Sequence, residues 1–288
     1  MPLVSGKELI KHALEGKYAI PAFGIVNLEG AIAAIEAATE TNSPVIIQTT
    51  QGGIEYAGHA QLAAIVISLA KDATIPVALH LDHGRDTKYH QKAIELGYTS
   101  LMIDGSPLSF DENVKITNQV IAMVRENNLN LSIEAELGKI GGKEDDVEDE
   151  GSTYTSVEDA INFIKQTNGG VDMLAIACGT SHGFYTKEPH INQELIKEVY
   201  AQTNVPLVLH GGTGVPLEQI TEAVGNGVVK VNIDSELKQG IIKGVMDYME
   251  KHPEAYDLRK INRQGIDYAK AIAISKIKAV KAVDKNWL

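Results

Sequence analysis

Three of the nine histidines in this chain are followed directly by glycine, and each pair comes just after a short apolar run. The pairs are His83-Gly84, His182-Gly183 and His210-Gly211. Three imidazoles that converge can bind a divalent ion such as Zn²⁺ and leave coordination positions open for a substrate. A single histidine in such a place is more often a hydrogen-bonded structural residue. Three together, with carboxylates nearby, favour a metal site, and glycine beside each ligand lets the backbone approach closely.

Carboxylates accompany these histidines in the sequence. Asp82 precedes His83, and it can act as a general acid/base or can orient an imidazole. Asp104 and Glu136 end two further apolar runs, where they can bind metal or orient its ligands. We expect only one of Glu134 and Glu136 to point inward, and the residue types alone do not choose between them.

A glycine-rich segment and a polar segment suggest a phosphate site. The stretch His210-Gly-Gly-Thr-Gly214 can direct backbone N–H groups and a hydroxyl at an anion, although ordinary turn chemistry has the same composition. Asn232, Asp234 and Ser235 follow the next apolar run. The loops after strands seven and eight commonly bind phosphate in (β/α)8 barrels, which favours the phosphate interpretation. Lys230 can in principle form a Schiff base, but we favour a structural or polar-contact role.

Short β-rich runs alternate with amphipathic helical segments along the chain, which predicts an α/β fold with a parallel sheet. The predicted strands are residues 18–23, 44–49, 76–81, 100–105, 131–136, 173–178, 206–211 and 228–233. Eight such units favour a closed (β/α)8 TIM barrel in one domain, residues 1–288, over an open doubly wound sheet. Ser5 and Glu8 form a capping-box pattern for an extra N-terminal helix. The segment from about Pro253 predicts extra helices outside the barrel or against a partner.

The segment from 137 to 156 is long for a connection in such a fold. It is rich in glycine and acidic residues and has no apolar period. Loops of this kind are functional lids or solvated acidic connections, and the sequence does not choose between these two.

Composition limits the classes of partner. The chain has 288 residues, a formal charge of −12 and no basic run, which argues against a nucleic-acid surface. No segment predicts a signal peptide or a membrane span. The one cysteine, Cys178, suits a reducing compartment, so we expect a cytoplasmic protein.

The motifs HLDHG, EAELG, SHG, LHGGTG and NID, in this order, resemble those of the class II fructose- and tagatose-bisphosphate aldolases. The resemblance covers nearly the whole chain. It implies a homodimeric or homotetrameric barrel lyase that reversibly cleaves a ketose 1,6-bisphosphate. The implied products are dihydroxyacetone phosphate and glyceraldehyde 3-phosphate.

The resemblance also implies roles for single residues. His83, His182 and His210 match zinc ligands, and Asp104 and Glu136 match carboxylates of a second, buried metal position, which favours Glu136 over Glu134. Asp82 matches the acid/base at the C4 hydroxyl, and Glu144 matches a mobile proton carrier. The matched substrate and phosphate binders are Gly183, Gly211, Gly212, Thr213, Asn232, Asp234 and Ser235. Thr50 matches a further substrate binder, and Arg259 an arginine from a neighbouring subunit. Gly183 and Gly211 also lie where the family binds Na⁺ or K⁺.

One departure leaves the sugar open. Gly24 stands where the family usually has an asparagine that helps to position the substrate. The leading substrate is still fructose 1,6-bisphosphate. Because of Gly24, tagatose 1,6-bisphosphate or another phosphorylated ketose is the alternative. A metallohydrolase with the same histidines and a non-catalytic phosphosugar binder are the competing classes.

Overall fold

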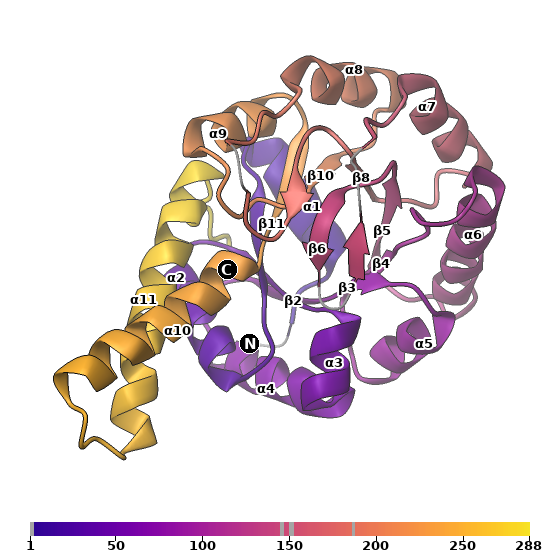
Figure 1. Ribbon diagram of the computed structural model, residues 1–288. Helices are drawn as coiled ribbons and strands as arrows, with labels where there is room; N and C mark the ends of the chain where they lie inside the picture. Colours follow the sequence, from indigo (N-terminus) through magenta and orange to yellow (C-terminus); the bar gives the residue numbers. More distant parts are fainter. Residues whose placement is uncertain (1–2, 145–146, 150–152, 186–187) are drawn as a thin grey trace.

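The computed structural model describes residues 3–144, 147–149, 153–185 and 188–288. Eight parallel strands close into a barrel, and most of the helices surround it (Figure 1). The strands, in their order around the barrel, are β1 (Ile20–Gly24), β2 (Val45–Thr49), β3 (Val77–Gly84), β4 (Ser100–Ile103), β5 (Ser132–Leu137), β8 (Met173–Ile176), β10 (Leu207–Leu209) and β11 (Val228–Ile233). The predicted (β/α)8 barrel is confirmed, and the open doubly wound sheet is excluded.

The barrel strands lie close to their predicted positions because nearly continuous apolar runs are typical of parallel strands that are buried on both faces. Every residue of β1, β2, β3, β5 and β11 is buried. The main difference is at β3, which continues beyond the predicted end at residue 81 through His83 to Gly84.

Several helices begin at a residue whose side chain caps the first turn. Ser5 and Glu8 form the expected capping box of α1. Asn27, Thr50, Asp86 and Ser156 accept hydrogen bonds from first-turn N–H groups of four later helices. The helices are α1 (Gly6–Gly16), α2 (Leu28–Glu40), α3 (Gln51–Ala57), α4 (His59–Asp72), α5 (Thr87–Glu95), α6 (Phe110–Glu126), α7 (Val157–Gln166), α8 (Gln193–Thr203), α9 (Leu217–Gly225), α10 (Ser235–Lys251) and α11 (Leu258–Ala279).

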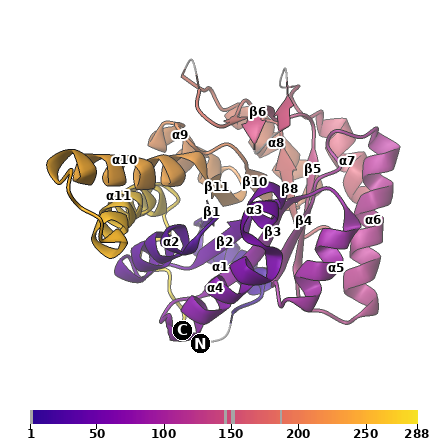
Figure 2. The same cartoon turned by 60° about the horizontal axis from the view of Figure 1, so that its bottom comes forward.

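The acidic segment after β5 carries strands that its sequence did not predict. β6 (Gly141–Glu144) pairs with β7 (Val147–Asp149) and with β9 (Ser181–His182) in a small sheet. Figure 2 places β6 at the end of the barrel opposite the two termini. The segment is therefore tied by backbone pairing to His182, one of the candidate ligands.

Two long helices end the fold. α10 and α11 pack together and extend well beyond the ring of helices (Figure 1), while α11 also contacts α2 and α9. Small residues permit this contact, since a Cβ atom on Gly265 would lie 2.8 Å from the carbonyl oxygen of Ile241. The prediction of extra helices outside the barrel is confirmed.

None of the helices among the described residues has the length and apolar character needed to cross a membrane.

Candidate metal and substrate site

His83, His182 and His210 come together at the carboxyl ends of the barrel strands, which is where active sites of this fold lie. One ring nitrogen from each residue lies within 4.8 Å of the others. Nε2 of His83 and Nδ1 of His210 are 2.9 Å apart. His83 and His210 are buried, and His182 is partly exposed beside a cavity. The donor set therefore fits a divalent ion such as Zn²⁺.

A β-bulge in β3 gives Asp82 and His83 access to the same site. Neighbouring residues of a regular strand point to opposite faces. The register between β3 and β4 shifts between Leu81 and Gly84, and His83 has a left-handed backbone conformation with φ 46°. Both side chains are therefore buried at the site, and such local irregularities are common next to active sites.

Two carboxylates fix the orientation of two histidine rings. Nδ1 of His83 lies 3.0 Å from Oδ2 of Asp104, and Nε2 of His210 lies 2.7 Å from Oε1 of Glu134. An ionised carboxylate accepts hydrogen bonds, so each of these ring nitrogens carries the proton. The nitrogens left to bind a metal ion are then Nε2 of His83 and Nδ1 of His210, which lie 2.9 Å apart. This carboxylate–histidine arrangement is typical of metal sites.

The expectation that only one of Glu134 and Glu136 points inward is wrong. Both carboxylates are buried, and Oε2 of Glu136 lies 3.8 Å from Nδ1 of His83 and 3.9 Å from Nδ1 of His210. Side chains along a strand alternate with a period of two, so residues 134 and 136 share one face of β5. His83, Asp104 and Glu136 form a second group whose ligand atoms can hold a metal ion.

A buried ion pair lies in the barrel interior and contacts the histidine site through Glu134. Nζ of Lys230 lies 2.9 Å from Oε2 of Glu134, and both side chains are fully buried. Burial alone raises the pKa of Glu134, but Lys230 and His210 outweigh it and lower the pKa to about 2. Glu134 is therefore ionised and can accept the bond from His210. Lys230 takes the polar-contact role expected from the sequence.

Asp82 lies in a polar pocket beside the histidines. Gln48 donates from Nε2 to Oδ2 of Asp82 at 2.7 Å, and Asn232 donates from Nδ2 to Oδ1 at 3.1 Å. Burial raises the pKa of Asp82, but His83, His80 and Lys230 outweigh it and hold the pKa well below its usual range. Asp82 is therefore a carboxylate at neutral pH and can accept a proton from a substrate hydroxyl.

A cavity of about 450 Å³ opens beside His182. Six of the sequence-predicted substrate residues line it, together with Gln48, Phe184 and Lys238. The six are Gly183, Gly211, Thr213, Asn232, Asp234 and Ser235. Glycine is required at two of these positions, because φ is 80° at Gly183 and 64° at Gly211. A Cβ atom on Gly211 would also overlap the carbonyl oxygen of Ser181.

Tyr185 connects the loops that carry two of the histidines. Its hydroxyl accepts a hydrogen bond from the N–H of Ser181 at 2.7 Å and donates to the carbonyl oxygen of Gly211 at 2.9 Å. Those residues adjoin His182 and His210, so this side chain helps to hold the two ligands at a fixed separation.

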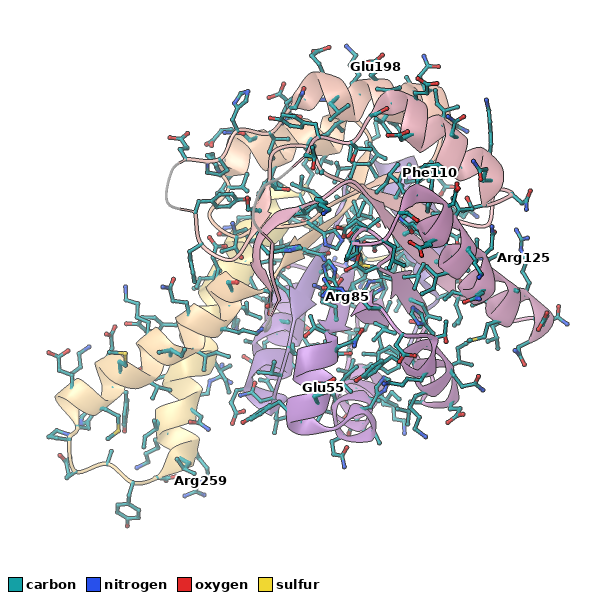
Figure 3. All side chains as sticks on the ribbon, turned by 45° about the vertical axis from the view of Figure 1, so that its right-hand side comes forward. Glu55, Arg85, Phe110, Arg125, Glu198 and Arg259 are labelled. Atoms are coloured by element: carbon teal, nitrogen blue, oxygen red, sulfur yellow. The ribbon has the colours of Figure 1, made fainter. Side chains whose placement is uncertain are left out.

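Four predicted site residues lie elsewhere or cannot be placed. Thr50 is buried and caps α3 through its hydroxyl. Gly212 bonds to the backbone of Asn232 and to Lys276 rather than lining the cavity. Arg259 lies at the outer end of the α10–α11 pair, far from the barrel (Figure 3), where it pairs with Asp257. Glu144 ends β6, but its side chain is outside the described part of the chain.

Several residues at the site were missed in the sequence. Gln48 is the penultimate residue of β2, close to the strand end where the other site residues lie, and that position was the available signal. Arg85 donates from Nε to Oδ2 of Asp104 at 2.8 Å and lies near the centre of the ring in Figure 3. Nothing in the local pattern distinguished Arg85, Tyr185 or Lys238 from surface residues.

The closed barrel and the three converging histidines have the architecture of a metal-dependent barrel enzyme. The family model described as fructose-bisphosphate aldolase class-II matches residues 4–285, and the chain belongs to this family.

Among curated relatives, the fructose-bisphosphate aldolase of Geobacillus stearothermophilus is 42% identical over 281 residues, 96% of each chain. That of Staphylococcus aureus (strain Mu50) is 40% identical over 96% of this chain and 97% of the relative. Among solved structures, the YdjI aldolase from Escherichia coli K12 has a TM-score of 0.86 and 32% identity, covering 99% of this chain and 100% of that one. The fructose-bisphosphate aldolase of Campylobacter jejuni has a TM-score of 0.84 and 26% identity, covering 99% and 97%.

Proposed function

We propose that this protein is a metal-dependent aldehyde-lyase that reversibly cleaves fructose 1,6-bisphosphate to dihydroxyacetone phosphate and glyceraldehyde 3-phosphate. One observation carries the proposal. Nε2 of His83 and Nδ1 of His210 lie 2.9 Å apart, and the other nitrogen of each ring contacts a buried carboxylate, next to the ionised Asp82. The fructose-bisphosphate aldolases that are 40–42% identical to the chain support this choice of substrate.

The proposed metal is Zn²⁺, held by His83, His182 and His210. A divalent ion there supplies Lewis-acid stabilisation of the negative charge that cleavage leaves on the dihydroxyacetone half. Asp104 and Glu136, with His83, offer the second position. Gly183 and Gly211 are the proposed contacts of a monovalent cation, Na⁺ or K⁺.

The chain's own residues handle the protons and the phosphate. Asp82 accepts the proton of the C4 hydroxyl as the carbon–carbon bond breaks. Glu144 then returns a proton to the dihydroxyacetone carbon. Gly211 and Thr213 bind the adjacent phosphate through a backbone N–H and a hydroxyl. Gly212 supports this loop, since its own N–H donates to the carbonyl oxygen of Asn232. Asn232, Asp234 and Ser235 contact the same half, and Thr50 helps to position the other.

The alternative substrates are tagatose 1,6-bisphosphate or another phosphorylated ketose, since Gly24 replaces the asparagine that the family usually has. A metallohydrolase would need neither the phosphate-binding loop nor a mobile proton carrier, so we place it second among the reaction classes.

We also infer that residues 1–288 act as one domain, in the cytoplasm.

We infer a homodimer or homotetramer in which the α10–α11 pair contacts a second subunit. Its outer end exposes large apolar side chains, with Met246 64%, Leu258 67% and Tyr256 92% exposed. Exposed apolar groups that lie close together mark interaction sites. Arg259 on the same end would then be available to the distal phosphate of a neighbouring site.

The test is an assay of cleavage of fructose and tagatose 1,6-bisphosphates, with and without EDTA. We expect EDTA and His182→Ala to abolish cleavage and bound metal, and His190→Ala, an exposed histidine, to change neither. Activity that survives EDTA, or borohydride trapping of an imine at Lys230, would overturn the metal mechanism. Hydrolysis without carbon–carbon cleavage would favour the metallohydrolase.

A further inference from the structure

Asp234 and Lys238 line the cavity, and Gly24 lies directly against the side chain of Asp234. Gly24 ends β1, Asp234 follows β11, and Lys238 lies in the first turns of α10. A Cβ atom on Gly24 would overlap the carboxylate of Asp234. Asp234 can therefore take its observed position only because residue 24 has no side chain.

The carboxylate of Asp234 does not cap its own helix. Aspartate at an N-cap normally accepts hydrogen bonds from the first turn, but Asp234 makes no such side-chain bond. Its Oδ2 instead accepts from Nζ of Lys238 at 2.6 Å. The side chains of Asp234 and Lys238 are 19% and 34% exposed, so the ion pair lies at the cavity wall and not free in solvent.

Lys238 differs in charge from the other residues that line the cavity. Of the described residues that line the cavity, it is the one with a permanent positive charge. Thr213, a proposed phosphate contact, and Ser235, a proposed contact of the same half of the substrate, line the same cavity. An ammonium group has three donors, so a bond to Asp234 is compatible with a second bond to a phosphate oxygen.

We propose that Lys238 binds the phosphate of the dihydroxyacetone half of the substrate, and that Asp234, admitted by Gly24, holds the ammonium group in place. This proposal rests on the proposed function, because it assigns the cation of the same phosphate site. It also assigns a function to Gly24, because the absence of a side chain at this position leaves the space that the Asp234 carboxylate occupies.

The first experiment measures binding of dihydroxyacetone phosphate and of inorganic phosphate to the metal-loaded protein by calorimetry. We expect Lys238→Gln to weaken both by about 10- to 100-fold, as the loss of a hydrogen bond to a charged group predicts. Lys238→Arg should retain most of the binding, and Lys243→Gln, an exposed lysine on the same helix, should change nothing. Unchanged binding of both ligands to Lys238→Gln would overturn the proposal.

The second experiment tests whether the three residues act together. Gly24→Ala should weaken phosphate binding by displacing Asp234, and it should add little in a Lys238→Gln background, because contacting residues are energetically coupled. If Gly24→Ala weakens phosphate binding equally in the wild type and in Lys238→Gln, the three residues do not act together and the proposal is overturned. These measurements detect binding and not cleavage. The wild-type protein could bind phosphate through Lys238 and still cleave neither ketose bisphosphate. That result would contradict the proposed function and leave the proposal about Lys238 standing.

Discussion

Glu134 lies on β5 and His210 directly follows β10, yet Oε1 of Glu134 is 2.7 Å from Nε2 of His210. β8 separates β5 from β10, after which His210 follows. The carboxylate also pairs with Lys230. Lys230 therefore keeps Glu134 ionised, and Glu134 in turn sets the tautomer of His210, a proposed metal ligand.

This relationship predicts how Glu134→Gln should affect metal binding. The amide cannot replace the charge that holds the proton on Nε2 of His210, so Nδ1 becomes a weaker ligand. Loss of such an orienting partner typically lowers metal affinity about 10- to 100-fold. Competition with a chelator would measure the change, and Glu198→Gln on the surface of α8 is the control (Figure 3). Equal affinity of both variants would contradict this role.

The same carboxylate predicts a dependence of stability on pH. In the folded protein its pKa is about 2, against 4.5 for an unperturbed glutamate. The unfolded chain therefore takes up the proton first as pH falls. The contribution, about 3 kcal/mol at most, is complete above pH 4.5 and is lost as pH falls toward 2. Urea unfolding at a series of pH values should show a smaller acid loss in Glu134→Gln than in the wild type.

Asp82→Asn should separate catalysis from metal binding. The amide keeps the size of the side chain beside Gln48 and Asn232 but cannot accept the proton of the C4 hydroxyl. We expect cleavage to fall by about 10²- to 10⁴-fold, the usual contribution of a general base. Metal content should change little when measured by atomic absorption. If metal is lost in proportion to activity, Asp82 is an orienting residue instead.

Gly211→Ala should destabilise the loop that carries His210. The new methyl group meets the backbone carbonyl of Ser181, and φ at this position is 64°. A non-glycine residue held in a left-handed conformation costs about 1–3 kcal/mol. Gly225→Ala is the matched control, because no atom lies within 4 Å of its added Cβ. Thermal unfolding should show a lower Tm for Gly211→Ala alone, and similar values for both variants would contradict the argument.

The pattern of apolar and polar residues along the chain is sufficient to predict the architecture. Eight buried apolar runs separated by amphipathic segments can close in few ways, because parallel strands need crossover helices and both faces of the sheet must be covered. The polar residues that follow those runs then meet at one end of the barrel. For that reason the three His-Gly pairs and most cavity-lining residues could be predicted without coordinates.

The direction of the polar side chains, in contrast, depends on contacts that form when the chain folds. The bulge that brings both Asp82 and His83 into the site depends on the register between β3 and β4. The contacts of Glu134 with His210 and Lys230 join residues far apart in the sequence. The position of Asp234 depends on the space left by Gly24. Local patterns fix where a strand ends, but side-chain direction, proton position and available volume are set by neighbours that the folded chain brings together.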